Sequence, residues 1–165
     1  MESNVLNLQA LLFRAVDNLA VTLNLEVPQI VVLEKLKLFP IDTLGRTLVD
    51  FLAANNLEPL TTGFRRKQLH DAVHVLTGYS TDLIGEAEVQ AFLLGGKFHF
   101  AQIMISSGLL YLIHQQMPNY DRRELKTRLT TAFDRGRNST FNVDTWQPEL
   151  QWYLPVTEVR KIYSL

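Results

Sequence analysis

The stretch HDAVHVLTGYSTDLIGE, residues 70–86, decides how the fold of this chain is interpreted. It opens with His70, Asp71 and His74, so two of the four histidines of the chain lie close together. A helix turns by about 100° per residue, which places His74 about 40° and Asp71 about 100° around the axis from His70. The three side chains therefore point into one quadrant of a predicted helix.

The residues that follow predict a tight turn and a second helix. Gly78 is typical of the position just after a helix C-terminus, and Thr81 or Asp82 is typical of an N-cap. The second helix then carries Glu86 about one turn from its start. Eleven residues separate His74 from Glu86, which is enough for a helical hairpin to bring the Glu86 carboxylate against the first three side chains.

Four donors of this kind suit a divalent cation, because two imidazoles supply nitrogen ligands and two carboxylates balance the charge of the ion. We predict a metal site at His70, Asp71, His74 and Glu86. Zinc suits the set best, while manganese, iron and magnesium remain open for nitrogen and oxygen donors. The alternative interpretation is a solvated helix face that binds no ligand.

Two better-known motifs do not fit these residues. A metalloprotease helix has glutamate directly after its first histidine, where this chain has Asp71. His-Asp phosphohydrolases need another histidine well upstream, and none precedes His70. Neither activity is predicted.

Apolar residues recur at intervals of three and four through most of the chain, which predicts an all-α fold. We expect a single domain over residues 1–165, built as a bundle of about seven helices that includes the metal-binding hairpin. A strand is the alternative where Ile30, Val31 and Val32 follow one another. The expected helices are one ending near Asn24, Gln29–Leu38, Leu44–Ala54, Arg66–Leu76, one from Thr81 or Asp82 to Leu94, Phe98–Gln116, Tyr120–Arg135 and Thr157–Ile162.

The composition limits the classes of function. Hydrophobic residues make up 47% of the 165 residues and charged residues 20%, as expected of a folded protein. The net charge of -1 gives no attraction to phosphate backbones, so we expect no nucleic-acid partner. Without cysteine, disulfides and cysteine-containing zinc sites are excluded. A mean hydropathy of +0.02 is consistent with apolar surface that meets a ligand or a membrane.

No segment has the length of a transmembrane helix. The most apolar one, Ala101–Ile113, is about 13 residues long, whereas a span needs roughly 20. The N-terminal region shows no targeting-peptide pattern, because Glu2, Asp17 and Glu26 oppose the single Arg14 there. We therefore expect a cytoplasmic location.

Several segments together resemble one known family. Residues 70–86, continuing through Gln90-Ala91-Phe92, resemble the signature of the coenzyme Q biosynthesis protein 4 family. This signature is H-D-x-x-H, followed by eleven residues and then a glutamate. Residues 39–46 (FPIDTLGR) and 57–59 (LEP) are similar to two further segments of that family. Residues 152–160 (WYLPVTEVR) resemble its closing run, although the last five residues, KIYSL, differ from the usual end.

The resemblance implies an all-helical protein that holds a divalent metal, usually zinc, through His70, Asp71, His74 and Glu86. It also implies an apolar cleft for a prenylated quinone precursor or another isoprenoid lipid, peripheral attachment to the cytoplasmic membrane, and other quinone biosynthesis proteins as partners. The family is connected with oxidative decarboxylation at ring carbon 1 of a prenylated hydroxybenzoate and with scaffolding of the other enzymes. The sequence does not decide whether the protein is an enzyme or a scaffold, and it does not decide whether the chain forms a homodimer.

Three short segments allow a functional and a structural interpretation. Arg65–Lys67 precede the metal helix and suit either a bound carboxylate or phosphate or a solvated helix start. Small residues at 106–108 leave room for a prenyl chain or for tight helix packing. Arg135–Arg137 suit a lipid head group or an ordinary helix C-terminus.

Three other ionisable residues are not expected to bind a metal. His99 and His114 are isolated from the motif and adjoin apolar residues, so we predict structural roles for them. Glu88 lies about 200° around the helix from Glu86 and is not predicted to be a ligand.

Overall fold

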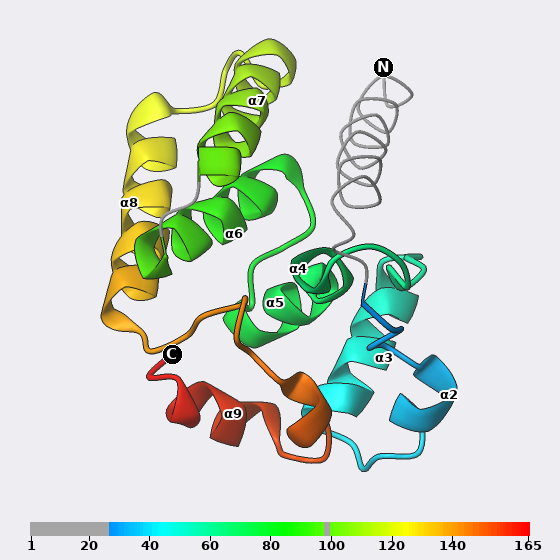
Figure 1. The fold of residues 1–165 in the computed structure, drawn as a ribbon. Helices are drawn as coiled ribbons and strands as arrows, with labels where there is room; N and C mark the ends of the chain where they lie inside the picture. Colours follow the sequence, from blue (N-terminus) through cyan, green and yellow to red (C-terminus); the bar gives the residue numbers. More distant parts are fainter. Residues whose placement is uncertain (1–26, 98–99) are drawn as a thin grey trace.

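The computed structural model describes residues 27–97 and 100–165 (Figure 1). Within these ranges the chain forms eight α-helices, one short 3-10 helix and no β-strand, which confirms the predicted all-α fold. The helix predicted to end near Asn24 lies outside the described residues. The observed elements are α2 (Leu33–Leu36), α3 (Leu44–Ala54), α4 (Arg65–Gln68), α5 (His70–Thr77), α6 (Leu83–Gly96), α7 (Phe100–Gln116), α8 (Arg122–Asn138), η1 (Pro148–Leu150) and α9 (Val156–Ile162).

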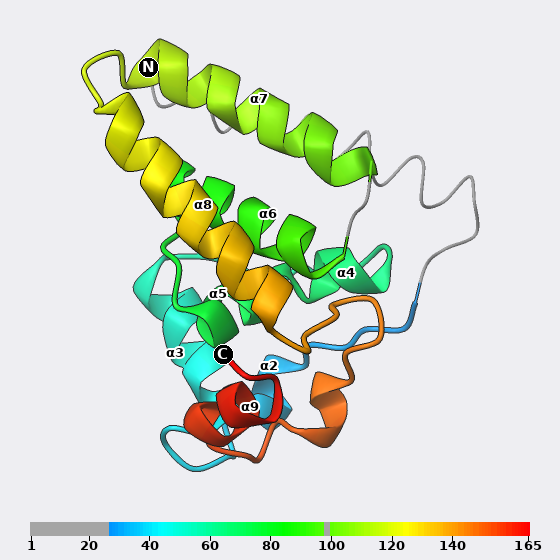
Figure 2. The same cartoon turned by 90° about the vertical axis from the view of Figure 1, so that its left-hand side faces the viewer.

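The helices form two groups that meet where α5 contacts α6. In Figures 1 and 2, α6, α7 and α8 lie together above, while α2, α3 and α9 lie together below. Helix α6 contacts both α7 and α8, and α5 contacts α3, α4 and α9. The predicted hairpin of α5 and α6 therefore lies at the junction of the two groups.

Two hydrophobic clusters both draw on α6, which makes it the central helix of its group. The larger cluster joins α3, α5 and part of α6 to the C-terminal tail and includes Trp146 and Trp152. The smaller one consists of residues from α6 and α7, namely Ile84, Ala87, Leu109 and Ile113. The apolar character of the Phe98–Gln116 sequence predicts a central helix, and this prediction is wrong: among the described helices the α7 backbone lies close to that of α6 alone, and Leu110 and Tyr111 are 44% and 61% exposed.

The helix ends around the hairpin follow the predicted capping pattern. Thr43 Oγ1 accepts a hydrogen bond from the backbone N–H of Arg46 at the start of α3. Asp82 Oδ1 accepts hydrogen bonds from the backbone N–H groups of Ile84 and Gly85, at 2.9 and 2.8 Å, at the start of α6. Gly78 ends α5 with a φ of 81°, a left-handed conformation that favours glycine.

The prediction of a helix over Gln29–Leu38 is wrong except at Leu33–Leu36, which form α2. Residues 27–32 are neither helix nor strand. The side chain of Gln68 takes the place of regular partners: its Oε1 accepts from the N–H of Ile30 at 2.9 Å, and its Nε2 donates to the carbonyl of Val27 at 3.1 Å. A buried side-chain amide from another part of the chain thus provides hydrogen-bond partners for the extended backbone.

Two predicted helix boundaries also differ. The helix expected over Arg66–Leu76 is divided into α4 and α5 at Leu69, whose side chain is fully buried. The helix expected to end at Leu94 continues through Gly95, where an added Cβ would meet the carbonyl oxygen of Phe133. Gly136 of α8 meets the carbonyl oxygen of Phe92 in the same way. These glycines act in close backbone packing between α6 and α8, not as helix breaks.

The C-terminal tail closes the lower group around α3. Backbone N–H groups of Leu44 and Gly45 donate to the carbonyls of Leu154 and Trp152, at 2.8 and 2.9 Å. The short helix predicted at Thr157–Ile162 is observed as α9, one residue longer. Among the described helices, none combines the length and the apolar character that a membrane crossing requires.

Candidate metal centre

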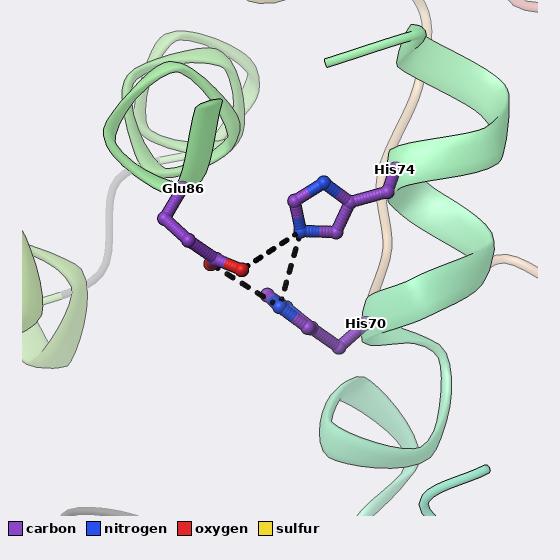
Figure 3. A group of neighbouring side chains, drawn as sticks. All are labelled: His70, His74 and Glu86. Atoms are coloured by element: carbon purple, nitrogen blue, oxygen red, sulfur yellow. Dashed lines mark hydrogen bonds and ion pairs between the residues drawn. The ribbon is translucent and has the colours of Figure 1, made fainter. Parts of the chain in front are cut away.

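Three of the four predicted ligands converge at the junction of α5 and α6. Figure 3 shows His70 and His74 on α5 and Glu86 on α6 pointing toward one another. Nε2 of His70 lies 3.3 Å from Oε2 of Glu86, Nε2 of His74 lies 3.3 Å from Oε1 of Glu86, and the two Nε2 atoms lie 3.2 Å apart. One ligand atom from each residue falls within 4.8 Å of the others.

Local helix geometry explains this convergence. His70 and His74 are four residues apart, so they lie one above the other on the same face of α5. Asp82 caps α6, and the backbone N–H of Glu86 donates to the Asp82 carbonyl at 2.8 Å, which places Glu86 in the first turn of α6. The capped start of α6 therefore fixes where Glu86 meets α5.

Asp71, the fourth predicted ligand, is half-buried on α5 and is not among the side chains whose ligand atoms converge. Its carboxyl group still interacts electrostatically with His70, His74 and Glu86. Burial raises the pKa of Asp71, the charges of His70 and His74 lower it, and Glu86 raises it, with a net increase. Its role as a ligand stays a prediction.

The ring of His74 is held on both sides. It is 1% exposed and stacks on the ring of Phe51 with centroids 6.0 Å apart. Its Nδ1 lies 3.1 Å from the carbonyl oxygen of Tyr79, which can only accept, so Nδ1 is the donor. In the neutral ring this leaves the lone pair on Nε2, the atom that faces His70 and Glu86. Metal-bound histidines in proteins are oriented in the same way.

The charges of the cluster depend on one another. Burial alone would raise the pKa of Glu86, but hydrogen bonds and charges from His70 and His74 outweigh it and lower the pKa to about 2. For His70, burial lowers the pKa, while the hydrogen bond and charge of Glu86, helped by Asp71, give a net increase. Positive charge beside Glu86 therefore stabilises its carboxylate, and a bound cation could supply that charge.

The other basic residues flagged in the sequence have partners within the chain. Arg65 donates to both carboxylate oxygens of Glu149 and to the carbonyl of Trp146. Arg66 donates to Asp144 at 3.0 Å. Arg65 and Arg66 therefore bind carboxylates of the C-terminal tail, and binding of a ligand carboxylate or phosphate there stays a prediction.

The remaining ionisable residues lie apart from the cluster. Glu88 accepts from Arg128 at 2.8 and 2.7 Å, in a two-bond ion pair between α6 and α8. His114 is exposed near the end of α7, with Nδ1 3.5 Å from the guanidinium of Arg122. His99 lies outside the described residues.

A groove of about 600 Å³ lies between α6, α7 and α8. Leu125, Leu129 and Phe133, which follow one another at intervals of four in the sequence, form its α8 wall. None of the four predicted metal ligands lines it, although Glu86 directly precedes a lining residue of α6. The remaining lining residues are Ala87, Ala91, Leu94, Ser106, Leu110, Ile113, His114, Met117, Pro118, Tyr120, Arg122, Lys126 and Thr130.

The small residues at 106–108 take different places around this groove. Ser106 lines it, whereas the hydroxyl of Ser107 donates to the carbonyl of Ile103 at 2.8 Å. A Cβ added at Gly108 would meet no atom of residues 27–97 or 100–165 within 4 Å. Tight packing of α7 at Gly108 against these residues is therefore not observed. Sequence reasoning missed the cations Arg122 and Lys126 at the groove, because the α8 sequence alone makes them look like solvated helix residues.

Comparison with known proteins decides the family. The family model for Coenzyme Q (ubiquinone) biosynthesis protein Coq4 matches residues 27–165. The chain belongs to the Coq4 family. The match covers the α5–α6 hairpin, the groove and the C-terminal tail, and it connects the chain with ubiquinone biosynthesis.

A solved structure supports the fold. The Coq4 chain is similar to the crystal structure of a candidate ubiquinone biosynthesis protein from Nostoc punctiforme, with a TM-score of 0.70 and 22% sequence identity. The similarity covers 83% of this chain and 69% of that chain. At this identity the likeness shows the fold alone. No curated protein matches the sequence significantly.

The coupled charges predict a bell-shaped pH dependence of stability in the metal-free protein. The pKa of Glu86 is lowered from 4.5, so its contribution is complete above pH 4.5 and is lost as the pH falls toward 2. The pKa of His70 is raised from 6.5, so its contribution is complete below pH 6.5 and is lost as the pH rises through the raised value. The difference in unfolding free energy between wild type and Glu86→Gln should peak between these limits, on the order of 2 kcal/mol. Urea titrations with chelator from pH 3 to 9 measure it, and a difference independent of pH would contradict this assignment of charges.

Proposed function

We propose that this Coq4-family chain binds one divalent metal ion through His70, His74 and Glu86, with Asp71 as the predicted fourth ligand. The carrying observation is the convergence of two imidazole nitrogens and a carboxylate within 4.8 Å. The donor bond of His74 to Tyr79 supports it, since Nε2 then offers a lone pair to an ion. Zinc suits these donors best, and manganese, iron and magnesium are the alternatives.

Asp71 distinguishes a structural from a catalytic metal. If it binds, four protein ligands close the tetrahedral site, as in structural zinc centres. If it stays outside, as the geometry of the three converging residues suggests, one position is free for substrate. The observed arrangement therefore favours an open site, with Asp71 beside it as a carboxylate whose raised pKa suits proton transfer.

We propose that the substrate is a prenylated aromatic acid of ubiquinone or related prenylquinone biosynthesis, acted on at ring carbon 1. A metal bound here would supply Lewis-acid stabilisation of the negative charge on the ring carboxylate or phenol. The residues of the chain orient that metal and exclude water: His74 is buried, and Phe51 covers its ring. The alternative is a carrier or scaffold that uses the same ion to hold an acidic head group.

The groove between α6, α7 and α8 supports binding of the isoprenoid chain. Its walls are mostly apolar, and its volume is in the usual range for small-molecule sites. Among the described residues no carboxylate lines it, whereas Arg122 and Lys126 give it a cationic side. This combination suits a long apolar tail with an acidic group attached.

The exposed apolar side chains next to the groove support peripheral binding to the cytoplasmic membrane. Leu110, Tyr111 and Met117 of the α7 end are all exposed, and Lys126 lies across the groove. Apolar side chains flanked by cations are typical of interfacial binding. A lipid could then pass from the membrane into the groove. Other quinone biosynthesis proteins are the expected partners, and a homodimer stays open.

Metal analysis tests the proposed site. Purified wild type should hold about one divalent ion per chain, and His70→Ala should lose most of it, because two of three converging donors cannot retain the ion against a chelator. His114→Ala, which changes an exposed histidine away from the cluster, is the matched control and should keep the wild-type content. Equal metal content in wild type and His70→Ala overturns the site.

Blocking the groove tests the isoprenoid site separately. Ala91→Trp adds a large side chain to the α6 wall and should abolish binding of a short-chain prenyl hydroxybenzoate, while metal content stays unchanged. Ala54→Trp, at an exposed position ending α3, is the control. Calorimetry and mass spectrometry of organic extracts are the measurements. Wild-type affinity in Ala91→Trp, or no isoprenoid binding by wild type, would assign the groove another role.

A further inference from the structure

Two arginines complete the hydrogen bonding at the C-terminus of α5, the helix that carries His70 and His74. The last four carbonyls of an α-helix have no partner within it. In α5, the carbonyl of His74 accepts from the N–H of Gly78 at 2.7 Å. Arg160 of α9 donates from Nη2 to Val75 at 3.1 Å and from Nε to Leu76 at 2.8 Å. The fourth carbonyl, that of Thr77, accepts from Nη1 of Arg135 of α8 at 2.7 Å.

Arg135 also holds the residue that orients His74. Its guanidinium lies over the ring of Tyr79, 5.5 Å from the centroid. The ring of Tyr79 in turn packs edge-on to Phe92 of α6, with centroids 6.5 Å apart. Arg135 therefore contacts the chain at Thr77 and at Tyr79, on both sides of the left-handed Gly78. The carbonyl that accepts from Nδ1 of His74 lies within this clamped turn.

Placing two positively charged arginines close together is electrostatically unfavourable, which argues against an incidental contact. Burial and the neighbouring charge of Arg135 lower the pKa of Arg160. Among the described residues, neither arginine forms an ion pair with a carboxylate, and their polar contacts are the α5 carbonyls. Two cations thus converge on the negative end of one short helix. A planar guanidinium can bind two carbonyls at once, which a lysine ammonium does less rigidly.

We propose that Arg135 and Arg160 are positioning residues for the metal centre. Arg160 fixes the last turn of α5 and Arg135 the turn at residues 77–79, so that the Tyr79 carbonyl holds Nδ1–H of His74 and Nε2 of the neutral ring keeps its lone pair toward His70 and Glu86. The effect on metal affinity rests on the proposed function. The tautomer itself is a property of the metal-free protein and does not depend on that function.

Nitrogen NMR of the metal-free protein with ¹⁵N-labelled histidine tests the proposal, because the two ring nitrogens report the tautomer directly. In the neutral wild-type ring, His74 should carry its proton on Nδ1. Arg135→Met and Arg160→Met should each give a mixture of tautomers and weaken zinc binding about 10–100-fold, the usual effect of removing a group that orients a metal ligand. Arg160→Lys, which retains the charge, should lie between wild type and Arg160→Met.

The matched control is Arg128→Met, because Arg128 also lies on α8 but donates to Glu88 and to the hydroxyl of Tyr120, not to α5. It should keep the wild-type tautomer and zinc affinity even if it lowers stability. The proposal is overturned if wild-type His74 carries its proton on Nε2, or if the methionine variants keep the wild-type tautomer. Where a methionine variant does not fold, the lysine variant at that position decides by the same readout. Failure of wild type to bind zinc would overturn the proposed metal function and leave the tautomer result intact.

Discussion

The interaction on which the rest of the structure depends is the bridge from Glu86 of α6 to His70 and His74 of α5. It joins the two groups of helices at their junction, and each partner lies largely out of solvent. A buried carboxylate without a partner would cost several kcal/mol, so the imidazoles must supply positive charge, as protons or as a bound ion. Folding of the hairpin and occupation of the candidate metal site are therefore linked.

Helix α6 connects this bridge to the groove. Glu86 faces α5, while Ala87, Ala91 and Leu94 of the same helix line the groove. Close packing at Gly136 holds α8 against α6, and α8 supplies both a groove wall and Arg135. The cluster and the groove thus share helix α6, which suits a ligand with a reactive head and a long tail.

The sequence predicted that His70, His74 and Glu86 lie together because the geometry that brings them together is local, whereas the predicted convergence of Asp71 is not observed. The four-residue spacing of the histidines, the glycine at position 78 and the cap at Asp82 each act within a few residues. Arg135 and Arg160 could not be assigned in this way, since they bond to carbonyls 58 and 84 to 85 residues away and leave no periodic signal. The same holds for Gln68, which keeps residues 27–32 out of a helix through a bond across 38 residues. At Gly95, a residue that often ends helices serves close packing, which depends on α8 and not on its neighbours in sequence.

The central claim is that the hairpin holds a metal through both histidines, and X-ray absorption at the zinc edge of the zinc-loaded protein tests it most directly. The account predicts two imidazole nitrogens at about 2.0–2.1 Å, with carboxylate or water oxygen completing the shell. The imidazole signal should fall by half in His74→Ala. A shell of oxygens without imidazole, or a spectrum unchanged by His74→Ala, would contradict the account.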